Sequence, residues 1–111
     1  SWSNDVFPLF GLPGAQDCGQ SGCHGASPQG GLTLTPINVA YAEIVGVLSN
    51  ADGGCSPLER VARGAPDDSH LFQKLAGSHS CGSLMPRDAA AFNSTQLDLV
   101  GDWIAEGAPN N

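Results

Sequence analysis

The chain has 111 residues, a length that suits one domain with a single modest core. Eleven acidic and four basic residues give a formal net charge of −7 at pH 7, which argues against nucleic acid or an anionic membrane surface as a partner. Because no apolar run approaches the roughly 20 residues that span a bilayer, we expect no transmembrane segment.

Glycine and proline are frequent, with 15 and 8 residues respectively. This composition predicts short regular elements joined by long irregular connections. We expect residues 1–111 to form one domain, because the sequence has no internal repeat and no low-complexity segment. Ser1 is expected to be the start of a mature or trimmed chain, since no basic and then apolar leader precedes the first predicted helix.

The first two predicted helices lie in the amino-terminal half. Residues 1–11 are predicted to form a short helix, with Ser3 or Asn4 as its N-cap. A second helix is predicted to have Asn38 as its N-cap and to run to about Leu48, because its apolar residues recur at helical spacing.

Two further helices are predicted in the carboxy-terminal half. One starts with a first turn at Pro66 and stops at Gly77. The other begins after Asn93 or Ser94 and is closed by Gly107. With no convincing pair of strands, the sequence predicts an all-α fold of three or four short helices and long loops.

The stretch from Cys18 to His24 is the most informative motif of the chain. Two thiols followed by an imidazole suit covalent haem attachment, because Cys18 and Cys23 can add across the two vinyl groups while His24 lies beneath the iron. The usual motif has two residues between the cysteines, whereas this chain has four. The longer spacer requires a bulged loop, which Gly19 and Gly22 favour because glycine adopts backbone angles that other residues avoid.

A structural zinc site is the alternative for these three residues. Zinc ligands usually come in spaced pairs, whereas side chains of adjacent residues such as Cys23 and His24 point apart, so haem is favoured. The remaining cysteines, Cys55 and Cys81, are either reactive thiols or a disulfide. A disulfide would close a loop of roughly 25 residues and raise the free energy of unfolding by about 3 kcal/mol in the chain-entropy model. A disulfide is the simpler interpretation. Covalent haem and a disulfide both indicate a periplasmic or extracellular protein.

Several weaker motifs occur in a fixed order along nearly the whole chain. They are Val6-Phe7-Pro8-Leu9-Phe10, Cys23-His24-Gly25, Gly31-Leu32-Thr33-Leu34, the run from Gly64 to Leu71, the run from Cys81 to Pro86 and the run from Trp103 to Pro109. In this ordered set the chain resembles class I c-type cytochromes, and more narrowly the bacterial cytochrome c-like domains often labelled planctomycete-type.

The resemblance implies a small cytochrome c-like fold whose helices and loops wrap one covalent haem c. It implies that Cys18 and Cys23 form the thioethers, that His24 is the proximal ligand of the iron and that Met85 is the distal ligand. A lone methionine is more often a core residue, and His79 is a competing ligand in the same loop. We favour Met85 because it lies in a loop and is followed by proline.

The expected function is electron transport by a monohaem cytochrome between a donor and an acceptor redox protein, not enzyme catalysis. The acidic surface either attracts a basic partner or serves solubility alone. Two other roles are considered: a fixed subunit of a respiratory or photosynthetic complex or haem polymer, and a haem sensor or enzyme from which Met85 dissociates.

His70 is predicted to be a solvated surface residue. The candidate residues for the pocket wall are Leu32, Leu34, Leu75 and Trp103.

Overall fold

The computed structural model describes residues 1–10, 18–20, 22–25, 31–49, 58–86 and 90–111. In these residues the regular structure consists of four α-helices, one π-helical turn and one 3-10 turn. Pairing between extended segments of the described chain is limited to two isolated bridges. The predicted all-α class is therefore confirmed for the part of the chain that the structure describes.

The chain begins with a π-helical turn, η1 (Trp2–Val6), which continues into α1 (Phe7–Phe10). The predicted cap at Ser3 or Asn4 is wrong, because the helical turn starts earlier. Ser1 is the N-cap, and its hydroxyl oxygen accepts a hydrogen bond from the N–H of Asn4 at 3.2 Å. The earlier start brings Trp2 into the core, where only 1% of its surface is exposed.

The second helix, α2 (Ile37–Ile44), has Pro36 as its N-cap in place of the predicted Asn38, and it ends four residues before Leu48. Its end is set by tertiary pairing. Val45 turns to an extended backbone and forms a bridge with Val61, and the next residue, Gly46, has a φ of +73°. The segment that follows α2 pairs with residues 58–61, and this pairing connects the two halves of the fold.

The helix predicted to start at Pro66 is divided into a 3-10 turn, η3 (Pro66–Asp68), and α3 (His70–Ala76). Ser69 causes the break. Its hydroxyl group is fully buried and accepts a hydrogen bond from the N–H of Ala62 at 2.8 Å, which holds an extended backbone between the two elements. Gly77 ends α3 in the left-handed conformation, as predicted.

The last helix, α4 (Ser94–Ala105), has the predicted cap at Asn93. The Asn93 side chain accepts from the N–H of Gln96, and the Gln96 side chain accepts from the N–H of Asn93, both at 2.9 Å. The apolar face predicted from helical spacing, Leu97, Val100, Trp103 and Ile104, is confirmed: the last three are buried and Leu97 packs against the core. None of the helices in the described residues is long and apolar enough to cross a bilayer.

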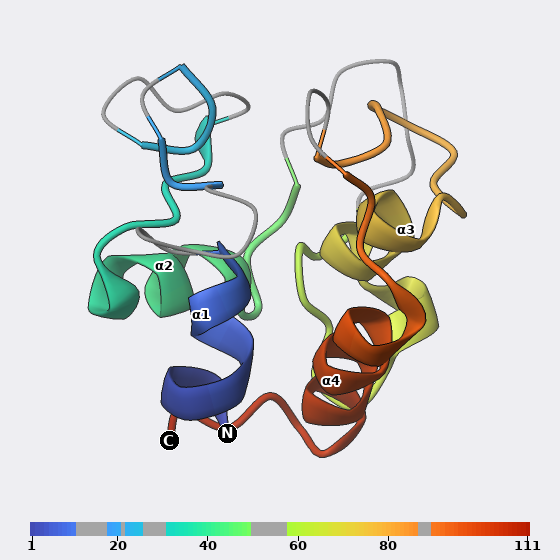
Figure 1. The fold of residues 1–111 in the computed structure, drawn as a ribbon. Coiled ribbons are helices and arrows are strands. Elements are labelled where there is room, and N and C mark those ends of the chain that lie inside the picture. The colour runs from blue at the N-terminus through green and yellow to red at the C-terminus, as the bar shows by residue number, and fades with distance from the viewer. Residues whose placement is uncertain (11–17, 21, 26–30, 50–57, 87–89) are drawn as a thin grey trace.

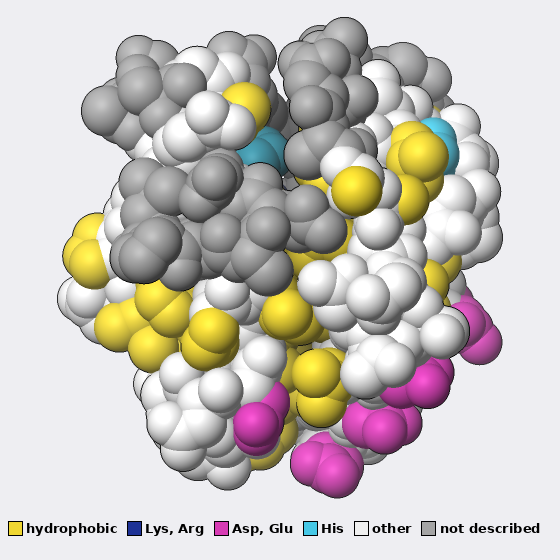
Figure 2. Space-filling model, in the orientation of Figure 1, with side chains coloured by type: hydrophobic (Ala, Val, Ile, Leu, Met, Phe, Trp, Pro, Cys, Tyr) yellow, Lys and Arg dark blue, Asp and Glu magenta, His cyan; other side chains and the backbone are white. Residues whose placement is uncertain are grey.

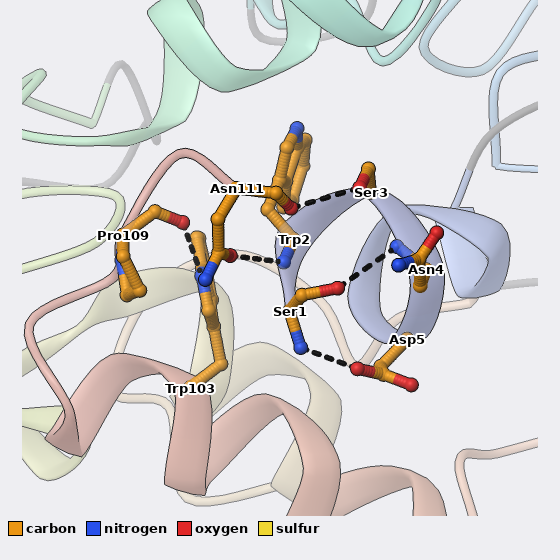
Figure 3. Close-up of polar contacts among 8 residues, drawn as sticks. All are labelled: Ser1, Trp2, Ser3, Asn4, Asp5, Trp103, Pro109 and Asn111. Atoms are coloured by element: carbon orange, nitrogen blue, oxygen red, sulfur yellow. Dashed lines mark hydrogen bonds and ion pairs between the residues drawn. The ribbon is translucent and has the colours of Figure 1, made fainter.

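The two ends of the described chain lie together at one end of the molecule, where η1 packs against α4 (Figure 1). Backbone and side-chain atoms of Asn111 accept hydrogen bonds from the N–H groups of Ser3 and Trp2, both at 2.9 Å (Figure 3). The indole N–H of Trp103 donates to the carbonyl of Pro109 at 3.0 Å. The hydrogen bonds therefore close the fold opposite the end that carries the cysteine loop.

Three aromatic side chains form the centre of this closed end. Trp2 stacks on Trp103 with ring centroids 5.1 Å apart, and Tyr41 meets the edge of Trp2 at 5.6 Å. Trp103 is 3% exposed, so its predicted core position is confirmed. Its observed neighbours belong to η1, α2 and the chain end, and its expected contact with a haem stays a prediction.

Candidate functional site

The loop that carries the two thiols and the imidazole is closed by its own backbone. The N–H of His24 donates to the carbonyl of Cys18 at 3.0 Å, and the N–H of Cys23 donates to the carbonyl of Gln20 at 3.2 Å. These bonds fold the described residues of the spacer, 19, 20 and 22, into a turn. Cys18, Cys23 and His24 therefore lie in one short, hydrogen-bonded loop.

Three glycines shape this loop in different ways. Gly22 has a φ of +88°, as expected for a position that needs glycine. Gly19 has no positive φ, and its N–H fastens the loop to the end of α1 through the carbonyl of Phe10 at 3.1 Å. Gly25 is buried, and a Cβ at this position would lie 2.4 Å from the carbonyl oxygen of Gly19 and 2.8 Å from that of Gln20. The loop therefore requires glycine at 25 for space.

Both motif cysteines are half-buried, and neither is part of a disulfide. Cys18 packs against the hydrophobic core cluster. Its sulfur lies 4.0 Å from the carbonyl oxygen of Leu9 in α1. One thiol therefore lies at the boundary between the loop and the core, where an apolar group attached to it would meet buried side chains.

The ring of His24 is oriented by the segment 31–35, which precedes α2. Its Nδ1 lies 3.0 Å from the carbonyl oxygen of Leu32. A carbonyl oxygen only accepts hydrogen bonds, so Nδ1 carries the hydrogen and the neutral ring has its lone pair on Nε2. The N–H of Leu34 donates to the carbonyl of His24 at 2.7 Å, which fixes the backbone as well. Metal-binding histidines are typically oriented in this way, by a hydrogen bond from the other ring nitrogen.

Met85 lies in a different loop from the other three predicted site residues. It is half-buried and packs against the same hydrophobic core cluster as Cys18. Its backbone is fixed at the end of α3, where its N–H donates to the carbonyl of Lys74 at 3.0 Å. In Figure 1 this loop (orange) and the loop from Cys18 to His24 (light blue) lie at the same end of the molecule, on opposite sides.

The prediction that His70 is a solvated surface residue is wrong, because His70 is only 3% exposed. Its Nε2 lies 3.0 Å from the carbonyl oxygen of Cys81 and therefore donates, while Nδ1 lies 2.6 Å from the hydroxyl oxygen of Ser49. The sequence suggested a surface position because a continuous helix was assumed. The break at Ser69 changes the direction in which the side chain of residue 70 points.

The loop that holds Met85 contains two further residues of interest. Cys81 is disulfide-bonded, but its predicted partner, Cys55, lies outside the described residues, so the pairing stays a prediction. His79 is half-buried, and its Nδ1 is buried with no hydrogen-bond partner in the described part of the structure. Of the predicted wall residues, Leu34 and Leu75 are 2% and 4% exposed, and Leu32 packs against the cluster.

The surface separates apolar and acidic side chains. Figure 2 shows hydrophobic side chains in the middle of one face and acidic side chains along its lower edge, over η3 and α4. Exposed acidic residues of these two elements are Asp67, Asp68, Asp98 and Asp102. In the described part of the chain, no three His, Cys, Asp or Glu side chains form a group that would hold a metal ion.

Comparison of the chain with protein-family models, curated proteins and solved structures gives no match. The assignment of a function therefore depends on the residues of this chain and on their geometry.

Sequence reasoning missed two residues that the structure connects to the site. Glu43 bonds to the backbone of Thr33, ten residues away, and His70 reaches the carbonyl of Cys81, eleven residues away. Neither contact follows from helical or extended periodicity. The sequence indicates Gly25 only as part of the Cys23-His24-Gly25 motif, and the structure adds that its burial against the loop backbone requires glycine.

We predict that Gly25→Ala prevents the cysteine loop from closing, because the added Cβ meets backbone oxygens that have no freedom to move aside. The free energy of unfolding should fall by about 3 kcal/mol, the upper range for overpacking, and the N–H of His24 should lose its protection in hydrogen exchange. Gly22→Ala is the control: nothing lies within 4 Å of its added Cβ, so it should cost about 1 kcal/mol and leave the loop closed. Equal protection in both variants would contradict the packing argument.

We predict that His70 restrains the loop of Met85 through the carbonyl of Cys81. His70→Asn removes the donor at the position of Nε2 and leaves that carbonyl without its bond, which should lower the free energy of unfolding by about 1–3 kcal/mol. Hydrogen exchange of the Met85 N–H should then accelerate. His70→Gln, whose amide reaches the same position, should retain most of the protection. Identical exchange in the two variants would show that the bond does not restrain the loop.

Proposed function

We propose that this protein carries single electrons between redox partners through one covalently attached haem. Cys18 and Cys23 would hold the haem by thioether bonds, and His24 and Met85 would be the axial ligands of its iron. When bound, the haem supplies the one-electron chemistry, and the chain supplies attachment, ligands and an apolar environment.

The orientation of the His24 ring is the observation that carries this proposal. An imidazole without a ligand needs no partner to orient its ring, whereas an iron ligand must present one fixed nitrogen. The hydrogen bond from Nδ1 to Leu32 defines Nε2 as that nitrogen. The same loop brings both thiols near the imidazole, and one of them, Cys18, borders the hydrophobic core.

The position of Met85 supports its role as the second axial ligand. A thioether on a surface loop would not be held in one place, but Met85 packs against the core and its backbone is bonded to the end of α3. Ligation by His and Met raises the reduction potential relative to ligation by two histidines, and apolar surroundings act in the same direction. With both axial positions filled, electron transfer is favoured over reaction with oxygen or peroxide.

The partners we propose are a donor and an acceptor redox protein outside the cytoplasm. The acidic edge over η3 and α4 lies away from the end that carries the cysteine loop (Figures 1 and 2). Electron transfer needs close approach to the haem, so a partner docked at this edge would be badly placed. We therefore assign the acidic edge to solubility.

The proposal predicts that the intact mass of the purified protein exceeds that of the bare chain by one haem. The increment should persist after extraction with acidified acetone, which removes non-covalent haem. Cys18→Ser with Cys23→Ser should abolish the increment, since the thioether bonds have no sulfur to form from. A colour that extracts and a mass equal to the bare chain would overturn the proposed function.

We predict that Met85→Ala removes the weak charge-transfer band that a thioether bonded to ferric haem gives at the red end of the visible spectrum. The reduction potential should fall, because the thioether favours ferrous iron. His79→Ala is the matched control in the same loop, and it should leave the band and the potential nearly unchanged. The opposite pattern would assign the sixth position to His79, whose buried Nδ1 makes it the competing ligand.

A further inference from the structure

A single peptide group, between Leu32 and Thr33, is hydrogen-bonded on both of its sides. Its carbonyl oxygen accepts from Nδ1 of His24 at 3.0 Å. Its N–H donates to the Oε2 atom of Glu43 at 2.6 Å. The carboxylate of α2 and the imidazole of the cysteine loop are therefore connected through one planar, conjugated amide.

Such a chain of hydrogen bonds is cooperative. A carboxylate that accepts from an amide N–H increases the negative partial charge on the carbonyl oxygen of the same amide, and this strengthens the bond that the oxygen accepts. The stronger bond at Nδ1 gives the ring of His24 more anionic character. A more anionic ring is a stronger donor at Nε2, which stabilises ferric relative to ferrous iron.

We propose that Glu43 is a positioning residue that tunes the reduction potential through the Leu32–Thr33 peptide and the ring of His24. This inference depends on the proposed haem function and deepens it. It gives α2 a role in setting the reduction potential, in addition to its packing in the core.

The surroundings of Glu43 hold it in place for this role. It lies in the last turn of α2 and is half-buried, next to the buried Ile44. The guanidinium of Arg60, which is 7% exposed, donates through Nη1 to the backbone carbonyl of Glu43 at 2.8 Å. Burial lowers the pKa of Arg60, while the Glu43 carboxylate acts in the opposite direction. A fixed positive charge thus lies near the carboxylate, in a part of the structure that excludes much of the solvent.

A purely structural role is the alternative: Glu43 would only fasten the segment 31–35 to α2. The two roles differ in what they require from the side chain. Fastening needs an acceptor oxygen at the position of Oε2, whereas tuning needs the negative charge. Glu43→Gln separates them, because glutamine has the same length and keeps an acceptor oxygen for the N–H of Thr33 but has no charge.

The experiment compares the midpoint potential and the proton resonance of His24 Nδ1 in the haem-loaded wild-type protein, Glu43→Gln, Glu43→Ala and the control Glu106→Gln. Glu106 is exposed and has the same formal charge. Glu43→Gln should change the equilibrium constant for electron exchange with a fixed partner by about threefold, a rise of roughly 28 mV at about 59 mV per tenfold change for one electron. Its Nδ1 proton should shift towards the value of a weaker hydrogen bond.

The Nδ1 resonance separates the route through the peptide from a direct effect of charge on the iron. A direct effect would move the potential and leave the hydrogen bond of His24 unchanged, and this outcome overturns the proposal. If Glu43→Gln and Glu106→Gln shift the potential equally, the proposal is also wrong. If the midpoint potential and the Nδ1 resonance change in Glu43→Ala but not in Glu43→Gln, Glu43 has only the fastening role and the proposal is wrong. Absence of attached haem in every variant, wild type included, would instead overturn the proposed function, and the tuning role with it.

Discussion

The hydrogen bond from His24 Nδ1 to the carbonyl of Leu32 is the interaction on which the site depends. It joins the cysteine loop to the segment that precedes α2 and determines which ring nitrogen carries the hydrogen. Without it the imidazole would rotate about its side-chain bonds and present either nitrogen. Because the N–H of Leu34 also donates to the backbone carbonyl of His24, the segment 31–35 positions both the ring and the backbone of His24.

The two sides of the proposed haem are held by different means. The proximal loop is short and is fixed by its own backbone bonds, with Gly25 packed against it. The distal side depends on a longer loop whose position is set by α3, through the carbonyl of Lys74, and by the buried ring of His70. For the proposed carrier of single electrons, this arrangement would keep both proposed ligands in place when the iron changes oxidation state.

The hydrophobic core contacts both the cysteine loop and the loop of Met85. Buried residues of η1, α1, α2 and α4 form one hydrophobic cluster, and Cys18 and Met85 both pack against it. The closed end, with Trp2 stacked on Trp103, fixes the helices relative to one another. Cys18 and Met85 therefore share one apolar support, in addition to the local hydrogen bonds that fix the loop of each.

The sequence alone determined the local features: the all-α class, the cap at Asn93, the stop at Gly77 and the glycine-rich bulge at Gly22. Each of these depends on residues within one or two turns, so periodicity and capping chemistry are sufficient to predict them. The haem-attachment motif indicated Cys18, Cys23 and His24 as candidates, and the resemblance to class I c-type cytochromes added Met85, but neither predicted their geometry.

Only the tertiary structure decided where α2 ends, where α3 begins and which polar groups support His24. Val45 leaves the helix because Val61 offers a backbone partner, and Ser69 divides a predicted helix because its hydroxyl is buried. The contacts of Glu43 and His70 join residues at least ten positions apart. No local pattern encodes such contacts, because their energy is realised only when separate segments meet in the folded chain.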